Sequence, residues 1–379
     1  MKIALLYGAF CLSFRKTLDL EGHRSDPRGL SGSELCAVRL FQELQAAGHD
    51  VTMFTLTSSP SEHWRPWEER TNEEYEAAIS VNVPDDLRGM KAKVRVAYCL
   101  LNEFSFCKVG FENHVDLFAS PSKSHMDQCL TNEAWRKVEV SPAHPDGKAQ
   151  WDPAAKLWAH VPLGCDPERY DGFTKAPGRV VYCSSPDRGL HWLLEQWPAI
   201  RRAVPHANLR IFYRLRDWLR TFDGTPYFPP IEKQRARTLY VGEALRRLEG
   251  HGVEVFDSVS RERIEREMAE AEVLAYPCDP ANDYTEGFSV ATLEGCAARA
   301  CPVITDVDAL GSIYGEAVPA VSRLLQSRPW QEAWRDNVIK CLLNETRRNN
   351  INDRAEALAR SMTWTNTATK LMAAIQERL

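Results

Sequence analysis

Two glutamates in the stretch TEGFSVATLEG (285–295) have the residue type and the spacing to hold a polar ligand. Glu286 lies in a predicted loop just before a helix, and Glu294 lies one to two turns inside that helix. Backbone N–H groups at a helix start point outward and attract anions. Acids at a helix start also complement the helix dipole without binding any ligand, so the pair by itself leaves both interpretations open.

The elements around this stretch favour a ligand site. A strand predicted over 272–277 precedes it, the helix runs from about Ser289 through Ala298, and a further strand is predicted over 301–306. The loop that carries Glu286 therefore leaves the carboxyl end of a strand. If that strand is parallel to its neighbours, this is the edge at which open α/β sheets bind ligands.

The whole chain alternates strand-like apolar runs with helical patterns. Such alternation predicts parallel, doubly wound sheets, and 379 residues suggest two domains. A polar, Pro-containing stretch over about 131–162 interrupts the pattern and is interpreted as an interdomain connection. The predicted strands lie at 2–10, 51–56, 75–84, 94–101 and 115–122, and then at 179–185, 208–214, 253–258, 272–277 and 301–306.

The composition excludes several classes of protein. A net charge of −5 offers no basic surface for nucleic acid, and no apolar run approaches the length of a membrane span. The eleven cysteines form no C-x-x-C pair, and the ten histidines show no zinc-ligand spacing. We therefore expect an α/β enzyme of the cytoplasm, with peripheral attachment to a membrane as an alternative.

The region from the 272–277 strand to CPVIT resembles the E-x7-E region of retaining glycosyltransferases of family four, which have the GT-B fold. In that family the first glutamate contacts sugar hydroxyls and the second binds the nucleotide ribose. The resemblance implies these roles for Glu286 and Glu294. It also implies that the amides of Gly287, Phe288 and Ser289 approach the sugar and the diphosphate.

The segment GLSGSE (29–34) resembles the family's Gly-rich loop, whose backbone donors meet the donor diphosphate or the acceptor. Gly29 and Gly32 leave room for a ligand to approach the backbone. Ser31 and Glu34 also have the spacing of a capping box, and a helix cap is compatible with a ligand loop.

The segment SSPDRGLHWLLEQWP (184–198) resembles the turn whose basic residues neutralise the donor diphosphate. Arg188 stands where the family usually has Lys, and a fixed cation there would stabilise the departing diphosphate. The family's other arginine is replaced by Tyr182 and Cys183. Arg188 therefore acts with backbone amides and Ser184, or with another cation such as Arg214; alternatively, it is an exposed arginine at a helix start.

The first domain departs from the family after the 94–101 strand. Many relatives have a histidine there, whereas this chain has Asn102 and Glu103. Asn102 can hydrogen-bond a sugar hydroxyl, and Glu103 is the remaining titratable group. Retaining enzymes of this fold are thought to use the donor phosphate as the base, so the resemblance implies that no histidine is needed.

The D-x-D pattern of Asp306 and Asp308 binds a metal in the other major glycosyltransferase fold. Here it follows a late strand and is interpreted as a pair of loop acids. We expect no metal and no other cofactor.

Two further segments match the family by position. VPLGCDPERY (161–170) resembles the entry into the second domain, and the helix that carries Trp364 resembles a terminal helix that crosses back onto the first domain. The expected GT-B architecture has two Rossmann-like domains that face a central cleft. The N-terminal acceptor domain spans residues 1–160, the nucleotide-sugar donor domain spans 161–360, and the returning helix spans 361–379.

The resemblance implies a retaining, metal-independent glycosyltransferase that moves a sugar from a nucleoside-diphosphate donor to an acceptor hydroxyl. The acceptor would be a glycan, a lipid-linked molecule or a small molecule, with no nucleic acid partner and no transmembrane segment. The alternatives are a nucleotide-sugar epimerase of the same fold and a non-catalytic nucleotide-sugar-binding protein. The nucleotide base and the sugar stay open.

Overall fold

The chain divides into two compact units. The first consists of Met1–Arg24, Leu30–Gly164 and Met362–Leu379, and the second of Ser25–Gly29 and Cys165–Ser361. These ranges differ from the predicted ones in that residues 161–164 belong to the first unit, whereas Ser25–Gly29 and Ser361 belong to the second. The computed structural model describes residues 1–8, 16–101, 104, 107–132, 137–139, 148–221, 232–279, 286–324 and 327–379.

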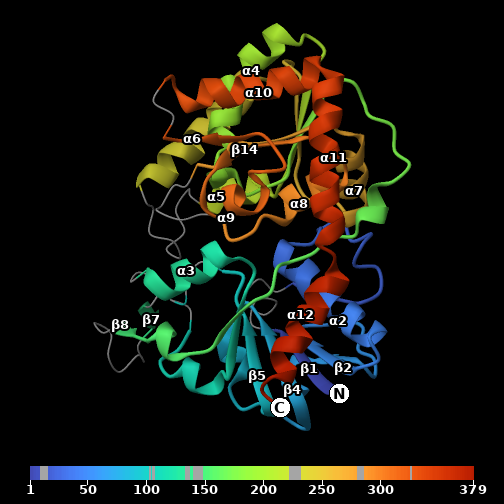
Figure 1. The fold of residues 1–379 in the computed structure, drawn as a ribbon, viewed down its shortest axis with the longest axis vertical. Helices are drawn as coiled ribbons and strands as arrows, with labels where there is room; N and C mark the ends of the chain where they lie inside the picture. The colour runs from blue at the N-terminus through green and yellow to red at the C-terminus, as the bar shows by residue number, and fades with distance from the viewer. Residues whose placement is uncertain are drawn as a thin grey trace. The chain divides into compact units, whose positions relative to one another are not determined.

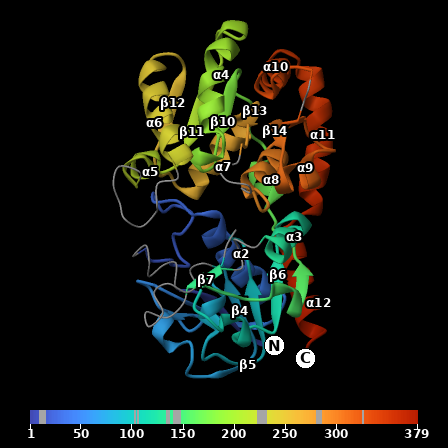
Figure 2. The same ribbon diagram turned by 90° about the vertical axis from the view of Figure 1, so that its left-hand side faces the viewer.

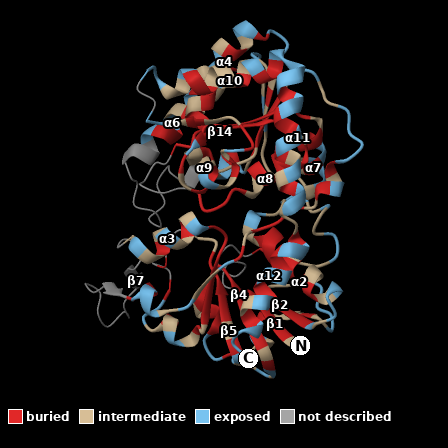
Figure 3. Ribbon diagram, viewed as in Figure 1, coloured by how far each residue is buried: buried red, intermediate tan, exposed pale blue. Residues whose placement is uncertain are grey.

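The first unit is built on a parallel sheet whose strand order is β3-β2-β1-β4-β5-β6-β9. Its central strands are buried (red in Figure 3), because helices cover a parallel sheet on its faces. β1 pairs with β2 on one side and with β4 on the other, so the strand order reverses between β1 and β4. The strands are β1 (Lys2–Tyr7), β2 (Asp50–Thr55), β3 (Trp64–Pro66), β4 (Glu74–Val81), β5 (Lys91–Tyr98), β6 (Leu117–Ser120) and β9 (Trp158–His160).

The interpretation of residues 131–162 as an interdomain connection is wrong. β9 pairs with β6 in parallel, so this stretch extends the first sheet. Its three strand residues are too few to produce a readable alternation, which explains why the pattern did not reveal them. The same stretch contains an antiparallel pair, β7 (Lys137–Glu139) and β8 (Lys148–Gln150), and the short helix η4 (Pro153–Ala155).

The helices of the first unit include one from the far end of the chain. α12 (Trp364–Gln376) contacts α2 (Gly32–Ala46), as Figure 1 shows, and Trp364 is buried. A Cβ at Gly164 would overlap the backbone of Thr363 and Trp364, so the two chain segments pack directly. The predicted return of the last helix to the first domain is confirmed. The remaining helices are α3 (Lys123–Thr131), η1 (Trp67–Glu69), η2 (Pro84–Leu87) and η3 (Phe111–His114).

The second unit is built on a parallel sheet of order β12-β11-β10-β13-β14-β15, which Figure 2 shows from β12 to β14. This is the doubly wound Rossmann order, with its reversal between β10 and β13. The strands are β10 (Arg179–Tyr182), β11 (Asn208–Phe212), β12 (Val253–Phe256), β13 (Val273–Tyr276), β14 (Pro302–Asp306) and β15 (Ala320–Ser322). β15 was not predicted, again because it is very short.

In the second unit α4 contacts α6 and α10, α8 contacts α7 and α11, and α10 also contacts α11. No helix within the described residues is both long and apolar enough to cross a membrane. The helices are η5 (Pro167–Tyr170), η6 (Pro186–Arg188), α4 (Leu190–Ala203), α5 (Leu215–Thr221), α6 (Glu232–Arg247), α7 (Arg261–Glu270), α8 (Val290–Ala297), α9 (Asp308–Tyr314), α10 (Trp330–Leu343) and α11 (Glu345–Ser361).

Candidate functional site

Two predicted site residues meet where the strand order of the second sheet reverses. Arg188 ends η6, shortly after β10, and Glu286 lies ahead of α8, after β13. Nη1 of Arg188 donates to Oε2 of Glu286 at 2.8 Å. Ligands of open α/β sheets bind at such a switch point, beyond the carboxyl ends of the strands. The fold therefore brings together two residues that lie 98 positions apart in the chain.

A tyrosine that sequence reasoning missed fixes the same carboxylate. Tyr276 is the last residue of β13, and its hydroxyl donates to Oε2 of Glu286 at 2.5 Å. Oγ of the predicted residue Ser184 donates to the Tyr276 hydroxyl at 3.0 Å. Burial raises the pKa of Tyr276 well above its ordinary value, so the phenol keeps its proton and remains a donor. In the sequence, the only indication of a functional role for Tyr276 is its position at the carboxyl end of a predicted strand.

Arg188 keeps its charge in this setting. Burial acts to lower the pKa of Arg188, but Glu286 and other neighbouring groups, Tyr276 and Asp187 among them, together outweigh that effect, and the pKa lies well above its ordinary value. Its side chain is 31% exposed, so it is not the freely exposed arginine of the alternative interpretation. Within the described part of the chain, its side chain donates to Glu286 alone, whereas a guanidinium has five N–H donors. Further donors are therefore available to an anion.

The two segments that carry this pair pack backbone against backbone. Gly189 directly follows Arg188 and has φ +105, and a Cβ there would overlap the carbonyl oxygen of Pro277. Pro277 directly follows Tyr276. Only glycine satisfies both the left-handed backbone and this close approach.

The backbone around Glu286 is held by its neighbours. Its N–H donates to Oδ2 of Asp308 at 3.1 Å, and the N–H of Phe288 donates to Oε1 of Glu286 at 3.4 Å. Ser289 has φ +69 and caps α8, with its side chain accepting from the Thr292 N–H. The buried Gly287 lies between Glu286 and Phe288. In this structure the Phe288 amide thus points at the glutamate of its own loop.

The D-x-D acids have separate surroundings. Asp306 is exposed at the end of β14, whereas Asp308 holds the Glu286 amide from the start of α9. Among the residues that the structure describes, no group of three or more His, Cys, Asp or Glu side chains is arranged to hold a metal ion. Metal independence stays a prediction.

The second predicted glutamate, Glu294, forms a buried ion pair with Arg261, the first residue of α7. Nη1 of Arg261 donates to Oε2 at 3.1 Å, and Nη2 donates to Oε1. Burial raises the pKa of Glu294, and Arg261 opposes that rise. Sequence reasoning missed Arg261 because it lies in a helix with many charged residues, RERIEREMAE, where nothing local distinguishes it.

A second cation near Arg188 comes from α6. Arg237 is buried and donates to the carbonyl of Asp279 at 2.8 Å, to its Oδ2 at 2.6 Å and to the carbonyl of Asp187 at 3.5 Å. Asp279 also pairs with Arg323, at 2.7 Å. The predicted candidate Arg214 is exposed, and its guanidinium contacts no acceptor in the described residues. Arg237, which sequence reasoning missed, thus contacts the turn that carries Arg188.

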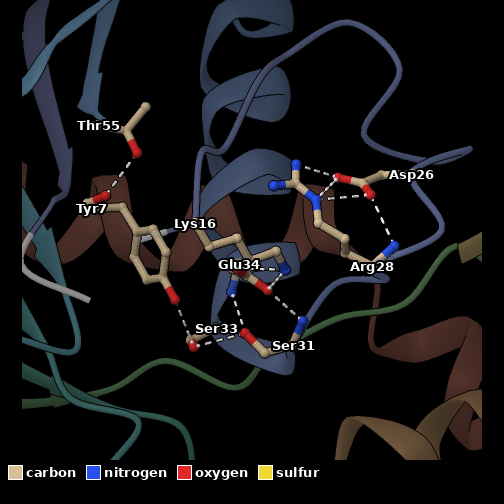
Figure 4. Close-up of polar contacts among 8 residues, drawn as sticks. All are labelled: Tyr7, Lys16, Asp26, Arg28, Ser31, Ser33, Glu34 and Thr55. Carbon is tan, nitrogen blue, oxygen red and sulfur yellow. Dashed lines mark hydrogen bonds and ion pairs between the residues drawn. The ribbon is translucent and has the colours of Figure 1, made fainter. Parts of the chain in front are cut away.

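The Gly-rich loop shows the predicted capping box. Ser31 caps α2 by accepting from the Glu34 N–H at 3.3 Å, and its own N–H donates to Oε2 of Glu34 at 2.6 Å (Figure 4). Lys16 adds a buried ion pair to Glu34 at 2.8 Å. Ser33 lies within hydrogen-bond distance of Tyr7, with 3.0 Å between the two hydroxyl oxygens. Several polar groups of this loop therefore cap the start of α2.

The two predicted glycines of this loop differ. Gly29 has φ +70, and a Cβ there would lie 2.6 Å from the carbonyl oxygen of Val259. Gly32 is the first residue of α2, and apart from its own helix and chain neighbours no atom of the described residues lies within 4 Å of where its Cβ would stand. Gly29 is therefore required by packing, whereas the space at Gly32 is open.

Asn102 and Glu103 lie outside the described residues. His125 contacts the residue just before them: its Nε2 donates to the Leu101 carbonyl at 2.8 Å, and its Nδ1 lies 2.8 Å from Oγ of Ser120. His125 is fully buried, and burial lowers its pKa to about 4. It is therefore neutral and serves to hold the chain after β5.

No protein-family model matches the chain, and no curated protein matches it in sequence. Solved structures match it in fold. The glycosyltransferase AviGT4, involved in avilamycin A biosynthesis, is 15% identical with a TM-score of 0.61, over 99% of this chain and 97% of that chain. Sucrose-phosphate synthase from Thermosynechococcus elongatus is 12% identical with a TM-score of 0.62, over 100% of this chain and 98% of that chain.

The chain has the GT-B fold. A third structure, the pneumococcal O-GlcNAc transferase GtfA in complex with UDP and GlcNAc, is 9% identical with a TM-score of 0.52, over 81% of this chain and 58% of that chain. The prediction of two Rossmann-like α/β domains is confirmed. At sequence identities of 9–15%, these similarities show a shared fold and nothing more specific.

Proposed function

We propose that this protein is a retaining glycosyltransferase that transfers a sugar from a nucleoside-diphosphate sugar to an acceptor hydroxyl. The observation that carries the proposal is the 2.8 Å ion pair between Arg188 and Glu286. It joins a cation suited to a diphosphate and a carboxylate suited to sugar hydroxyls, at the ligand-binding edge of the second sheet. Structures with the same fold include glycosyltransferases, one of them solved with UDP and GlcNAc.

In the proposed complex Glu286 binds the donor sugar. Its Oε2 already receives Arg188 and Tyr276, and its Oε1 receives the Phe288 amide at a long 3.4 Å. A carboxylate whose orientation is set before the sugar arrives discriminates between sugars by the position of their hydroxyls.

Arg188 stabilises the leaving group. Cleavage of the bond between the sugar and the phosphate develops negative charge on the diphosphate, and a preorganised guanidinium lowers the energy of that state. Typical losses on removing one such donor are about 3–4 kcal/mol in the barrier. Since protein cations supply this charge, with Arg237 beside the same turn, the proposed reaction needs no metal.

Retention of configuration requires the acceptor hydroxyl to attack the face that the leaving group departs from. The donor phosphate then takes the acceptor's proton, so the protein needs no separate base. Asn102, as a hydrogen-bond partner of a donor-sugar hydroxyl, and Glu103, as a titratable group, belong to this proposal as candidate catalytic residues. A glycan, a lipid-linked molecule or a small molecule is the proposed acceptor class, in the cytoplasm.

Incubation with labelled UDP, GDP, ADP and dTDP sugars tests the proposal, after a thermal-shift panel has selected the nucleotide. Transfer to an acceptor, or slow donor hydrolysis, with the anomeric configuration retained supports it. Release of an epimerised sugar identifies the epimerase instead. Binding without any turnover identifies a non-catalytic nucleotide-sugar-binding protein.

A further inference from the structure

Glu294 is held by an arginine to which the proposed reaction assigns no task. Arg261 and Glu294 form a two-pronged pair in which each carboxylate oxygen accepts from one guanidinium nitrogen. The two side chains are only 12% and 5% exposed. Paired contacts of this type between a guanidinium and a carboxylate are among the strongest hydrogen bonds in proteins and also fix the relative orientation of the two groups.

The guanidinium is itself fixed from other sides. Its Nη2 donates to the hydroxyl of Tyr170 in η5 at 3.0 Å, and its Nε donates to Oε1 of Glu265 at 3.1 Å. Three acceptors from η5, α7 and α8 therefore surround Arg261. A side chain held in this way is a rigid support for Glu294 and not a latch that swings away.

The helix that begins with Arg261 does not explain the presence of this arginine. A cation in the first turn of a helix opposes the helix dipole, and Arg261 is the first residue of α7. Residues that break such a local rule are expected where they serve a site. The contacts of Arg261 point to Glu294 as the group that it serves.

The geometry leaves Glu294 able to bind two hydroxyl groups. Each carboxylate oxygen accepts two hydrogen bonds, and Arg261 uses one on each oxygen. Among the described residues, Arg261 alone donates to the Glu294 carboxylate, so one acceptor position on each oxygen remains there, which suits a pair of adjacent hydroxyls. The 2′- and 3′-hydroxyls of ribose form such a pair, whereas a 2′-deoxyribose offers only one hydroxyl.

We infer that Arg261 is a positioning residue that holds Glu294 as an oriented carboxylate, and thereby makes the site select a ribonucleoside diphosphate over its 2′-deoxy counterpart. This inference rests on the proposed function, in which Glu294 binds the nucleotide ribose. It adds a source of nucleotide selectivity that lies outside the E-x7-E segment.

Calorimetric titration of the full chain with UDP, GDP and ADP, and with dUDP, dGDP and dADP, tests the inference. The wild type should bind the ribonucleotide of its base roughly 10-fold more tightly than the deoxy form, the value of one well-made hydrogen bond to a charged group. Arg261→Gln should bring that ratio close to 1, mainly by weakening the ribonucleotide. Arg261→Lys should keep part of it.

The matched control is Arg263→Gln, in the same helix. Arg263 pairs with Glu267 at 2.5 Å and is 44% exposed, so its loss should leave the ratio unchanged. A double variant of Arg261→Gln and Glu294→Gln should lose no more of the ratio than either single variant, because the two residues act as one unit. Circular dichroism and thermal melting establish whether each variant folds. If Arg261→Gln does not fold, the affinity ratio of Arg261→Lys tests the inference in its place.

Three results would overturn the inference. One is a wild type that binds both forms of its nucleotide equally. Another is an Arg261→Gln protein that keeps the wild-type ratio of ribonucleotide to deoxyribonucleotide affinity, even if both affinities are weaker than in the wild type. Failure of the wild type to bind any of these nucleotides, and dTDP as well, would overturn the proposed function too, so the two failures are distinguishable.

Discussion

The carbonyl oxygen of Pro277 occupies the space that a Cβ at Gly189 would need. The turn after β10 and the loop after β13 therefore approach each other at a point where one holds Arg188 and the other follows Tyr276. This close approach, together with the hydrogen bond from Ser184 to Tyr276, holds the two segments that carry Arg188 and Glu286 near each other. Several predictions of function rest on that arrangement.

Gly189→Ala should disturb the site through the backbone. The substitution adds a Cβ where φ is +105 and where Pro277 already lies, so we expect about 1–3 kcal/mol lower stability and a tenfold or larger loss of transferase activity. Gly172→Ala is the matched control, because Gly172 also has a positive φ, +83, but no atom lies within 4 Å of its Cβ position. Equal effects in the two variants would mean that φ strain alone is responsible.

Tyr276→Phe should lower turnover without unfolding the protein. The change removes the hydroxyl that donates to Glu286 at 2.5 Å, and the carboxylate then loses one of its fixed donors. We expect kcat to fall roughly tenfold, in line with about 1.5 kcal/mol for a hydrogen bond to a charged group. Tyr98→Phe, which removes a buried hydroxyl bonded to the Val161 carbonyl at 2.6 Å in the first unit, should leave kcat unchanged.

Glu286→Gln and Arg188→Gln should both lower kcat/KM by roughly 100-fold or more, since each removes a charge that the proposed transition state uses. Removal of divalent metal with a chelator should leave the wild-type rate unchanged. Substitution of the exposed Arg202 by Gln is the control for the loss of a positive charge. Wild-type turnover in Glu286→Gln would refute the site assignment, and a rate that disappears with chelator would refute the metal-independent mechanism.

Acid should destabilise the fold through His125. Burial lowers its pKa from 6.5 to about 4, so the unfolded chain binds the proton more readily than the folded one. The stabilising contribution is complete above pH 6.5 and is lost as the pH falls toward 4, up to about 3 kcal/mol in all. Urea unfolding of the wild type at pH 7 and pH 4.5 measures this loss.

His125→Gln should reduce that pH dependence, because glutamine does not titrate, although its absolute stability falls with the lost buried contacts. The same substitution at the exposed His206 should leave the pH dependence as it is in the wild type. An unchanged slope in His125→Gln would show that other groups account for the acid effect.

Much of the fold followed from local pattern. The apolar runs predicted the longer strands of both sheets, and the spacing of Ser31 and Glu34 predicted a capping box that the structure contains. These features are readable because a strand or a helix cap involves residues within a few positions of each other. β9 and β15, with three residues each, are too short to leave such a pattern.

The sequence by itself determined two alternating α/β halves, and its resemblance to a known family implied a returning terminal helix and a common site for Arg188 and Glu286. Only the tertiary structure decided that these two side chains meet, that Tyr276 fixes the carboxylate, and that Arg261 holds Glu294. The partners in these contacts are up to 98 positions apart, and the order of the strands in the sheet places them together. Hydrophobic periodicity records which face of each element is buried, whereas strand order is set by how whole elements pack, and that information is not local.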